Sequence, residues 1–365
     1  GYKIYSFNDE LVFNLFIGKR VLQEEISSKG IPIYSANVYE PFGNIDISEN
    51  DKNVFKSKTK LVTWGIDGDW MVNIMEENRM FYPTDHCGVL EVKIDDILPE
   101  YLRYALYSVG KQQRFSRSNR ASIQRLKTLK IQVPNLTEQR EIVDSISCIE
   151  SEIKRNKNKI TNKKSEIFKL YKSIKQNSQT TDLAEYADII SGYAFKSNEF
   201  SKDGVYVVRI SDLDENSVCL HRAKKFNSLF WDNNERYRIL EKDILVGMSG
   251  SIGKNSIYLS KEKALLNQRI ACIRCKNTDN YRLVFCMIND PDTQKYIQNI
   301  SYGNSQKNFS GKDLEILKVP KLSIEQITNF NGKANDLFKE IEELLSSTQT
   351  LKDELENLIF KFFGD

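Results

Sequence analysis

Two long segments of the chain carry apolar residues in a repeating alternation of four and three positions. The apolar stripe of the first segment consists of Ile142, Ile146, Ile149, Ile153, Ile160, Ile167, Leu170 and Ile174. The polar residues Asn156 and Lys163 occupy two further positions of that stripe. The second stripe keeps its alternation from Ile327 to Phe362, over about five heptads. A heptad pattern sustained over this length predicts two coiled-coil helices.

The two expected helices differ in charge. Residues 151–175 contain nine basic and two acidic side chains, a net charge of +7, whereas residues 323–363 carry a net charge of −4. Opposite charges favour pairing of the helices, and the order of the chain makes that pair antiparallel. At about 1.5 Å per residue, a helix over residues 138–174 would be roughly 55 Å long, which would separate two domains by more than one DNA turn of about 34 Å. The alternative is that the lysines form only a solvated helix face.

The segments that precede the two helices are predicted to be copies of one domain. The matched positions are Gly18 with Gly192, Gly30 with Gly204, and Pro134 with Pro320. The glycine pairs share an offset of 174 residues and the proline pair has an offset of 186, so small insertions distinguish the copies. Glu138–Gln139 and Glu325–Gln326 follow the two prolines. We interpret them as capping residues in the first helical turns.

Each copy has the pattern of a mixed α/β domain. The expected strands, short apolar runs bounded by Gly, Asn and Asp, are 31–36, 60–64, 87–93, 206–210, 244–248 and 271–274. The expected helices within the copies are 99–108 and 281–289. We therefore predict an α/β (α+β) chain with two pseudo-symmetric domains separated by two long antiparallel coiled-coil helices. The expected boundaries are 1–135 for the first domain, 136–178 for the central helix, 179–321 for the second domain and 322–365 for the C-terminal helix.

Composition limits the class of protein. The chain has 365 residues, of which 40% are hydrophobic and 28% charged, and its mean hydropathy of -0.49 is that of a globular chain large enough for two cores. No apolar run approaches the roughly 18 residues that span a bilayer. The six cysteines are scattered, as is usual in a reducing compartment. We expect a cytoplasmic protein that does not contact a membrane.

One basic segment is the best nucleic-acid signal in the chain. Residues 111–130 contain seven basic side chains and no acidic one. Cations contact phosphates, whereas arginine and amide side chains hydrogen-bond to base edges. The candidate DNA-binding residues are Lys111, Arg114, Arg117, Asn119 and Arg120, and in the second copy Asn304, Ser305, Gln306 and Lys307. The alternative is a mobile polar loop without a ligand.

Signals for a catalytic centre are weak. Residues 248–255 resemble a phosphate-binding loop, but Met248 replaces its first glycine and Asn255 replaces the hydroxyl residue that would hold magnesium. Cys272 and Cys275 form a CxxC within an expected strand, without a second such pair or a nearby histidine. We predict no catalytic residues, no cofactor and no metal in this chain.

Several stretches resemble the specificity subunit of type I restriction-modification systems. They are the proline-led start of each long helix and residues 61–68, 81–88, 115–119 and 189–196. The resemblance covers essentially the whole chain. It implies two target-recognition domains that each read one half of a bipartite site in double-stranded DNA, held apart by the helix pair.

The same resemblance implies the partners. They would be two adenine-N6 methyltransferase subunits, which use S-adenosylmethionine, and restriction/translocase subunits, which use ATP and magnesium. Three alternatives stay open from the residues alone: an enzyme with its own site near residues 247–255 or 272–275, a coiled-coil scaffold that binds only proteins, and the recognition subunit of another restriction system with a fused methylase-nuclease partner.

Overall fold

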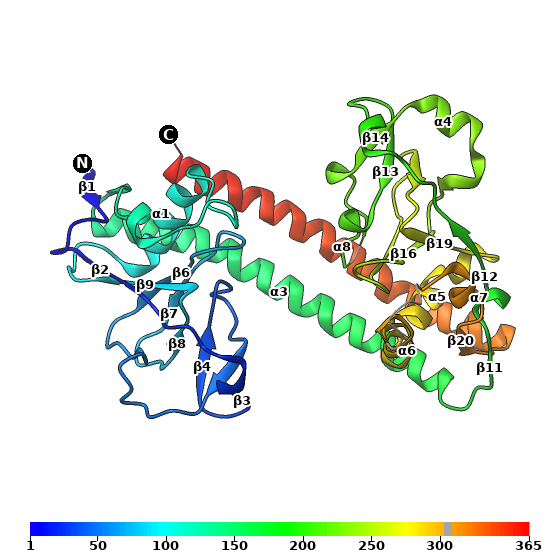
Figure 1. Cartoon of the computed structure of the whole chain (residues 1–365), viewed down its shortest axis with the longest axis horizontal. Coiled ribbons are helices and arrows are strands. Elements are labelled where there is room, and N and C mark those ends of the chain that lie inside the picture. Colours follow the sequence, from blue (N-terminus) through cyan, green and yellow to red (C-terminus); the bar gives the residue numbers. More distant parts are fainter. Residues whose placement is uncertain (216, 303–308, 365) are drawn as a thin grey trace. The chain divides into compact units, whose positions relative to one another are not determined.

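The computed structural model describes residues 1–215, 217–302 and 309–364, and the chain divides into two compact units. Unit 1 comprises Gly1–Lys157 with Leu345–Asp365, and unit 2 comprises Asn158–Leu344. Two 40-residue helices, α3 (Leu136–Lys175) and α8 (Ile324–Phe363), each contribute one part to each unit (Figure 1). These helices cover both heptad segments, so the prediction of two long helices is confirmed.

Unit 1 is built on a four-stranded antiparallel sheet with the strand order β2-β9-β6-β7. These strands are β2 (Phe13–Ile17), β6 (Leu61–Gly65), β7 (Val72–Met75) and β9 (Cys87–Val92). A second sheet has the order β3-β5-β4-β8, with β3 (Ile26–Ser27), β4 (Ile31–Tyr34), β5 (Gly43–Ile45) and β8 (Tyr82–Pro83). The remaining strands, β1 (Lys3–Ser6) and β10 (Lys130–Val133), form an antiparallel pair.

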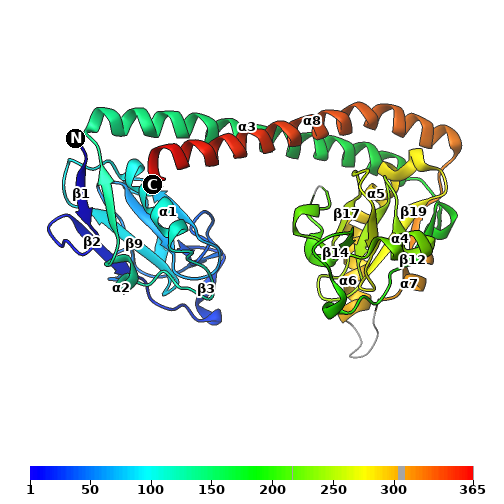
Figure 2. The same cartoon turned by 90° about the horizontal axis from the view of Figure 1, so that it is seen from above.

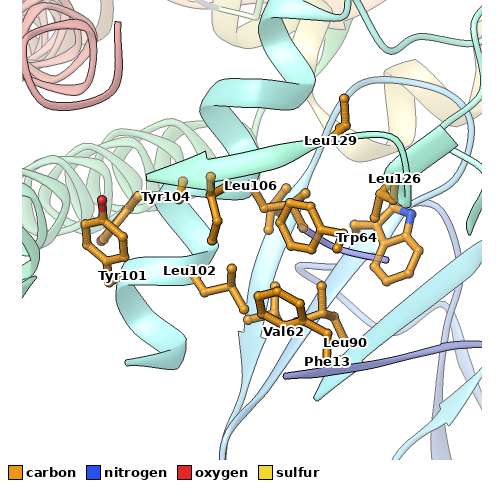
Figure 3. Close-up of a cluster of buried hydrophobic side chains, with 14 of the residues drawn as sticks. Phe13, Val62, Trp64, Leu90, Tyr101, Leu102, Tyr104, Leu106, Leu126 and Leu129 are labelled. Carbon is orange, nitrogen blue, oxygen red and sulfur yellow. The ribbon is translucent and has the colours of Figure 1, made fainter. Parts of the chain in front are cut away.

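Helix α1 (Pro99–Gln112) covers the larger sheet of unit 1 by packing on β6 and β7. Its spacing of apolar residues places Leu102 and Leu106 on the buried face, where both are fully inaccessible to solvent. Figure 3 shows them in the same cluster as Val62 and Trp64 from β6, with Leu126 of the short helix α2 (Ile123–Leu126) beside the tryptophan. Full burial of each leucine stabilises the fold by about 2 kcal/mol, so this cluster holds α1 against β6.

Unit 2 repeats this architecture. Its larger antiparallel sheet has the order β12-β19-β16-β17, with β12 (Ala187–Ser191), β16 (Ile244–Gly247), β17 (Asn255–Ile257) and β19 (Ile270–Cys275). The second sheet contains β14 (Lys224–Phe226), β13 (Val205–Val208), β18 (Ala264–Leu266) and β15 (Arg238–Ile239), in that order. Strands β11 (Thr180–Asp182) and β20 (Lys318–Pro320) pair as β1 and β10 do. The helices are α4 (Ser228–Asn233), α5 (Tyr281–Asn289), α6 (Pro291–Tyr302) and α7 (Gly311–Glu315), and α5 packs against β19 (Figure 2).

The matched glycines occupy equivalent places in the two units, which confirms the predicted duplication. Gly18 follows β2 and Gly192 follows β12, and a side chain on either would lie about 2 Å from a backbone carbonyl oxygen (1.9 Å and 2.0 Å). Gly30 precedes β4 and Gly204 precedes β13, with φ angles of +107° and +120°. Only glycine adopts such angles without strain, so both copies retain the same backbone requirements.

Helices α3 and α8 pack together through the predicted apolar stripes, which form the seam between them. In unit 1, the polar seam residue Asn156 is 8% exposed and its Nδ2 donates to Ser347 Oγ over 3.4 Å. In unit 2, the other polar seam residue, Lys163, forms an ion pair with Glu340 of α8. Both polar positions therefore face a polar partner on the opposite helix. The ion pair agrees with the pairing of a basic helix with an acidic one.

The starts of the two long helices differ in a way that the capping interpretation did not anticipate. Gln326 fits it, because its Oε1 accepts from Ser323 N over 2.9 Å and its own N donates to Ser323 Oγ over 3.1 Å. For Gln139 the interpretation is wrong. This side chain is fully buried, accepts from Leu98 N over 2.8 Å, and donates to the carbonyl oxygens of Asp96 (2.8 Å) and Pro134 (2.9 Å). Gln139 therefore joins the start of α3 to the start of α1.

Candidate nucleic-acid interface

The basic segment of unit 1 spans the end of α1 and the loop that follows it. Lys111, still within α1, lies 3.7 Å from Glu356 of α8, and both side chains are largely exposed. An exposed pair at this distance is worth at most about 1 kcal/mol, so the lysine can exchange that partner for a phosphate. Arg114 ends the helix in a left-handed conformation with φ of +57°. Arg114 and Arg117 are exposed, so each offers a cation to a ligand.

Asn119 organises this loop from inside. Its Nδ2 donates to the carbonyl oxygens of Gln113 (2.9 Å) and Arg114 (3.4 Å), and its Oδ1 accepts from Arg125 Nη1. Arg125 Nη1 also donates to the carbonyl oxygen of Arg120 over 2.8 Å. Both ends of the Asn119 amide are thus occupied by the loop itself. The DNA contact that the sequence assigns to Asn119 would require these hydrogen bonds to be exchanged, whereas the neighbouring arginines are already exposed.

Two tryptophans attach the loop to the sheet of unit 1. Trp64 Nε1 donates to the carbonyl oxygen of Ala121 over 2.9 Å. Trp70 Nε1 donates to the carbonyl oxygen of Tyr107 over 2.9 Å, and its ring lies 5.1 Å from that of Phe115. Trp64 of β6 therefore holds the end of the loop, and Trp70 of the β6–β7 connection contacts its beginning at Phe115. That these tryptophans hold the loop was not predicted from the sequence. The signal for it was that two of the three tryptophans of the chain lie six residues apart, in one strand and the turn that follows it.

The loop carries its exposed arginines beside an acidic hairpin. Arg120 Nη2 lies 3.9 Å from Asp67 Oδ2 in the β6–β7 connection, and the Arg120 side chain is 54% exposed. A rigid, basic loop next to a tight turn can supply both phosphate contacts and directed hydrogen bonds. Lys111, Arg114, Asn119 and Arg120 are brought together on this part of unit 1 by α1 and its loop.

In unit 2, the four candidates Asn304, Ser305, Gln306 and Lys307 lie outside the described residues. The segment just before them is fixed to the β16–β17 connection, because Gln298 Nε2 of α6 donates to the carbonyl oxygen of Ile252 over 2.7 Å and Gln294 Nε2 donates to that of Gly253 over 3.2 Å. These groups border a hollow of about 670 Å³ that Lys254 and Asn289 also line. The β16–β17 connection thus occupies the same place in its sheet as the β6–β7 connection does in unit 1.

The two sequence patterns considered for a nucleotide or zinc site lie in a hairpin and in a strand of unit 2. Residues 248–254 connect two antiparallel strands, and Gly247 N donates to the carbonyl oxygen of Lys254 over 2.8 Å. A phosphate-binding loop leads from a strand into a helix, so this hairpin lacks the helix N-terminus that would hold phosphates. Cys272 and Cys275 lie three residues apart on β19, and burial raises the pKa of the Cys275 thiol to about 12. Within the described ranges, no three His, Cys, Asp or Glu side chains are grouped for a metal ion.

Two units with the same sheet topology, each with a connection at the equivalent place in its larger sheet, define a protein with a duplicated α/β fold. Among the helices of the described residues, none combines the length and apolar character needed to cross a membrane. The family model of the type I restriction modification DNA specificity domain matches residues 7–163 and 175–357. The chain belongs to this family.

One curated relative and one solved structure are similar to this chain. The chain is 27% identical over 176 residues to the type I restriction enzyme EcoBI specificity subunit of Escherichia coli, a match that covers 47% of this chain and 33% of that protein. The chain thus matches about a third of the length of this curated relative. The crystal structure of the S subunit of a type I restriction-modification system from M. genitalium is similar in fold, with a TM-score of 0.57 at 15% identity, covering 100% of this chain and 96% of that one.

Proposed function

We propose that this chain is the DNA-reading subunit of a type I restriction-modification complex and recognises a bipartite site in double-stranded DNA. The observation that carries the proposal is the repetition of one sheet topology in both units, with chemically different side chains in the equivalent connections β6–β7 and β16–β17. Equivalent scaffolds with different loops suit two half-sites of different sequence. Family membership supports the same function.

The candidate DNA contacts in unit 1 are Lys111, Arg114, Arg117 and Arg120, with Asn119 as an organiser of the loop that carries them. Exposed cations of this kind bind phosphates and make affinity depend on salt. Base preference requires side chains in fixed geometry, which the anchoring of the loop by Trp64 supplies. In unit 2, residues 304–307 remain the proposed counterpart.

Helices α3 and α8 would set the distance between the half-sites and offer their outer faces to partners. A 40-residue helix is about 60 Å long, so residues added to it would lengthen the unread DNA between the half-sites. The proposed partners are two adenine-N6 methyltransferase subunits that bind S-adenosylmethionine, and restriction/translocase subunits that bind ATP and magnesium. This chain would contribute specificity and no catalytic group, and it would act in the cytoplasm.

The direct test is a methylome. DNA from cells that express this chain with the adenine methyltransferase encoded beside it is compared, by long-read sequencing, with DNA from cells that express the methyltransferase alone. A bipartite adenine-methylated motif that requires both proteins supports the proposal and gives the half-sites and the spacer. No new motif, with both proteins present in the soluble fraction, would contradict it and favour a scaffold that binds only proteins.

A second comparison assigns the half-sites to the units. Residues 180–320 are exchanged for those of a relative with a different motif, while residues 1–135 are retained. We expect one half-site to change and the other to persist, and the persistent half-site is then the one read by unit 1. A change of both half-sites would contradict independent reading by the two units.

A further inference from the structure

Three polar side chains from separate segments of unit 1 meet at the edge of the basic loop. They are Asp67 in the β6–β7 connection, His86 just before β9, and Arg120 just before α2. The Asp67 Oδ2 atom lies 2.9 Å from His86 Nδ1 and 3.9 Å from Arg120 Nη2. The exposed fractions are 28% for Asp67, 40% for His86 and 54% for Arg120, so the carboxylate is the most enclosed member. One carboxylate oxygen therefore faces both a ring nitrogen and a guanidinium group.

The backbone of one buried residue holds the three segments together. Ile66, which is 3% exposed, donates its N–H to the carbonyl oxygen of His86 over 3.0 Å and accepts from Ala121 N over 2.7 Å. Asp67 follows Ile66 in the sequence, His86 is itself one of the two hydrogen-bond partners of Ile66, and Arg120 precedes Ala121, the other partner. Gly68 turns the chain directly after Asp67 with a φ of +78°, and no atom lies within 4 Å of the position that a Cβ would take there. The cluster is thus fixed by backbone hydrogen bonds, and only its side chains face the solvent.

A fixed guanidinium group is what base recognition demands. Arginine can donate two parallel hydrogen bonds to O6 and N7 of guanine in the major groove, and this discrimination is lost when the group can rotate freely. The Asp67 carboxylate lies 3.9 Å from the Arg120 guanidinium and attracts it without a hydrogen bond, while the Arg120 backbone is held by Arg125, which donates to its carbonyl oxygen. Arg117, in the same loop, is also exposed. Arg120 is therefore the arginine of the loop with both a fixed backbone and a carboxylate beside its side chain.

We propose that Arg120 reads a guanine in the half-site of unit 1, and that Asp67, whose Oδ2 atom also lies beside His86, is the positioning residue that orients it. This inference rests on the proposed function and adds to it the base and the residues. The two contributions differ in kind. Arg120 would contact the base edge, whereas Asp67 would act only through Arg120.

The test uses the methylome of cells that express the full chain with its methyltransferase. Arg120→Lys keeps the charge but removes the paired hydrogen bonds, so we expect one guanine position of the unit 1 half-site to accept other bases, with preference for guanine reduced about tenfold or more. Asp67→Asn, which is nearly the same size, should relax that same position to a smaller degree. Arg20→Lys, at an exposed arginine of unit 1 outside the basic loop, is the matched control, and it should leave the motif unchanged.

Affinity measurements distinguish the remaining outcomes. The purified complex is titrated with a duplex of the wild-type motif and with duplexes substituted at the guanine, so that a variant too weak to methylate is still measured. Unchanged base preference in Arg120→Lys overturns the proposal, and so does an equal loss of affinity for all duplexes, since that pattern belongs to a phosphate contact. Relaxation at different positions in the two variants would also overturn it. Absence of any motif with the unmodified chain would instead refute the proposed function.

Discussion

Replacement of Gln139 by leucine tests whether the equivalent glutamines of the two repeats have different roles. Gln139 is fully buried and makes three hydrogen bonds to backbone groups, whereas Gln326 is half-buried and caps α8 through Ser323. Leucine is similar in volume and removes all three hydrogen bonds of Gln139. The change therefore isolates the polar contacts from the packing.

The magnitude follows from the groups that lose a partner. Leu98 N is left without its acceptor in a part-buried position, which costs about 1–3 kcal/mol. The carbonyl oxygens of Asp96 and Pro134 lose one donor each, and we expect a total of about 2–4 kcal/mol. Gln326→Leu exposes only Ser323 N, which water can reach, so we expect at most about 1 kcal/mol.

The assay is urea unfolding followed by amide hydrogen exchange, because the two units need not unfold together. In Gln139→Leu, faster exchange should be confined to the start of α1 and the start of α3 in unit 1. In Gln326→Leu, the smaller effect should be confined to the start of α8. Equal losses of stability in the two variants would refute the assignment of different roles, and so would a loss in Gln139→Leu spread evenly over both units.

Three further predictions follow from the helices and their attachment. Insertion of one heptad into both α3 and α8 should lengthen the unread spacer by about 3 base pairs, since seven residues add about 10 Å of helix and a base pair about 3.4 Å; altered half-sites with an unchanged spacer in the methylome would contradict this. Asn156→Leu should raise the thermal stability of the protein by up to about 1 kcal/mol, because a polar seam residue specifies register at a cost in stability; a marked loss in calorimetry would mean that its contact with Ser347 contributes more than we infer. Lys175 lies 2.9 Å from Asp292, and this hydrogen bond lowers the pKa of the Asp292 carboxyl below its usual 3.8. Because that pKa is lowered on folding, the contribution is present above about pH 4 and is lost as the pH falls through the lowered value. An acid-unfolding profile that is identical in Asp292→Asn, which leaves the pair between Lys175 and Asp290 in place, would contradict it.

The sequence predicted the framework well because regular patterns encode it. The helix expected over residues 281–289 has those bounds in α5, and the expected strand at 244–248 is β16, Ile244–Gly247. Heptads identified both long helices because their apolar period is sustained over many turns. The paired glycines were visible because the backbone approaches at Gly18 and Gly192 exclude every side chain.

The candidate site was less predictable, since it depends on contacts between residues far apart in the sequence. Composition identified the basic segment, but not that Trp64 would attach it to β6 or that the Asn119 amide would be used within the loop. The same limit explains the error at Gln139, where the local pattern matched a helix cap. Its actual partner, Leu98 N, lies 41 residues away and is brought there by the packing of α1.

The two repeats differ most where the framework imposes the least constraint. Gly30 and Gly204 are needed for a left-handed backbone in both units, whereas the equivalent connections after β6 and β16 share only their place between two antiparallel strands. The first presents the acidic Asp67, and the second presents hydroxyl groups and Lys254. A change at a solvent-accessible position of these connections, such as Asp67 or Lys254, alters the exposed chemistry without removing a buried side chain of the sheet. One fold can therefore carry two different recognition surfaces, and a change in one surface need not affect the other.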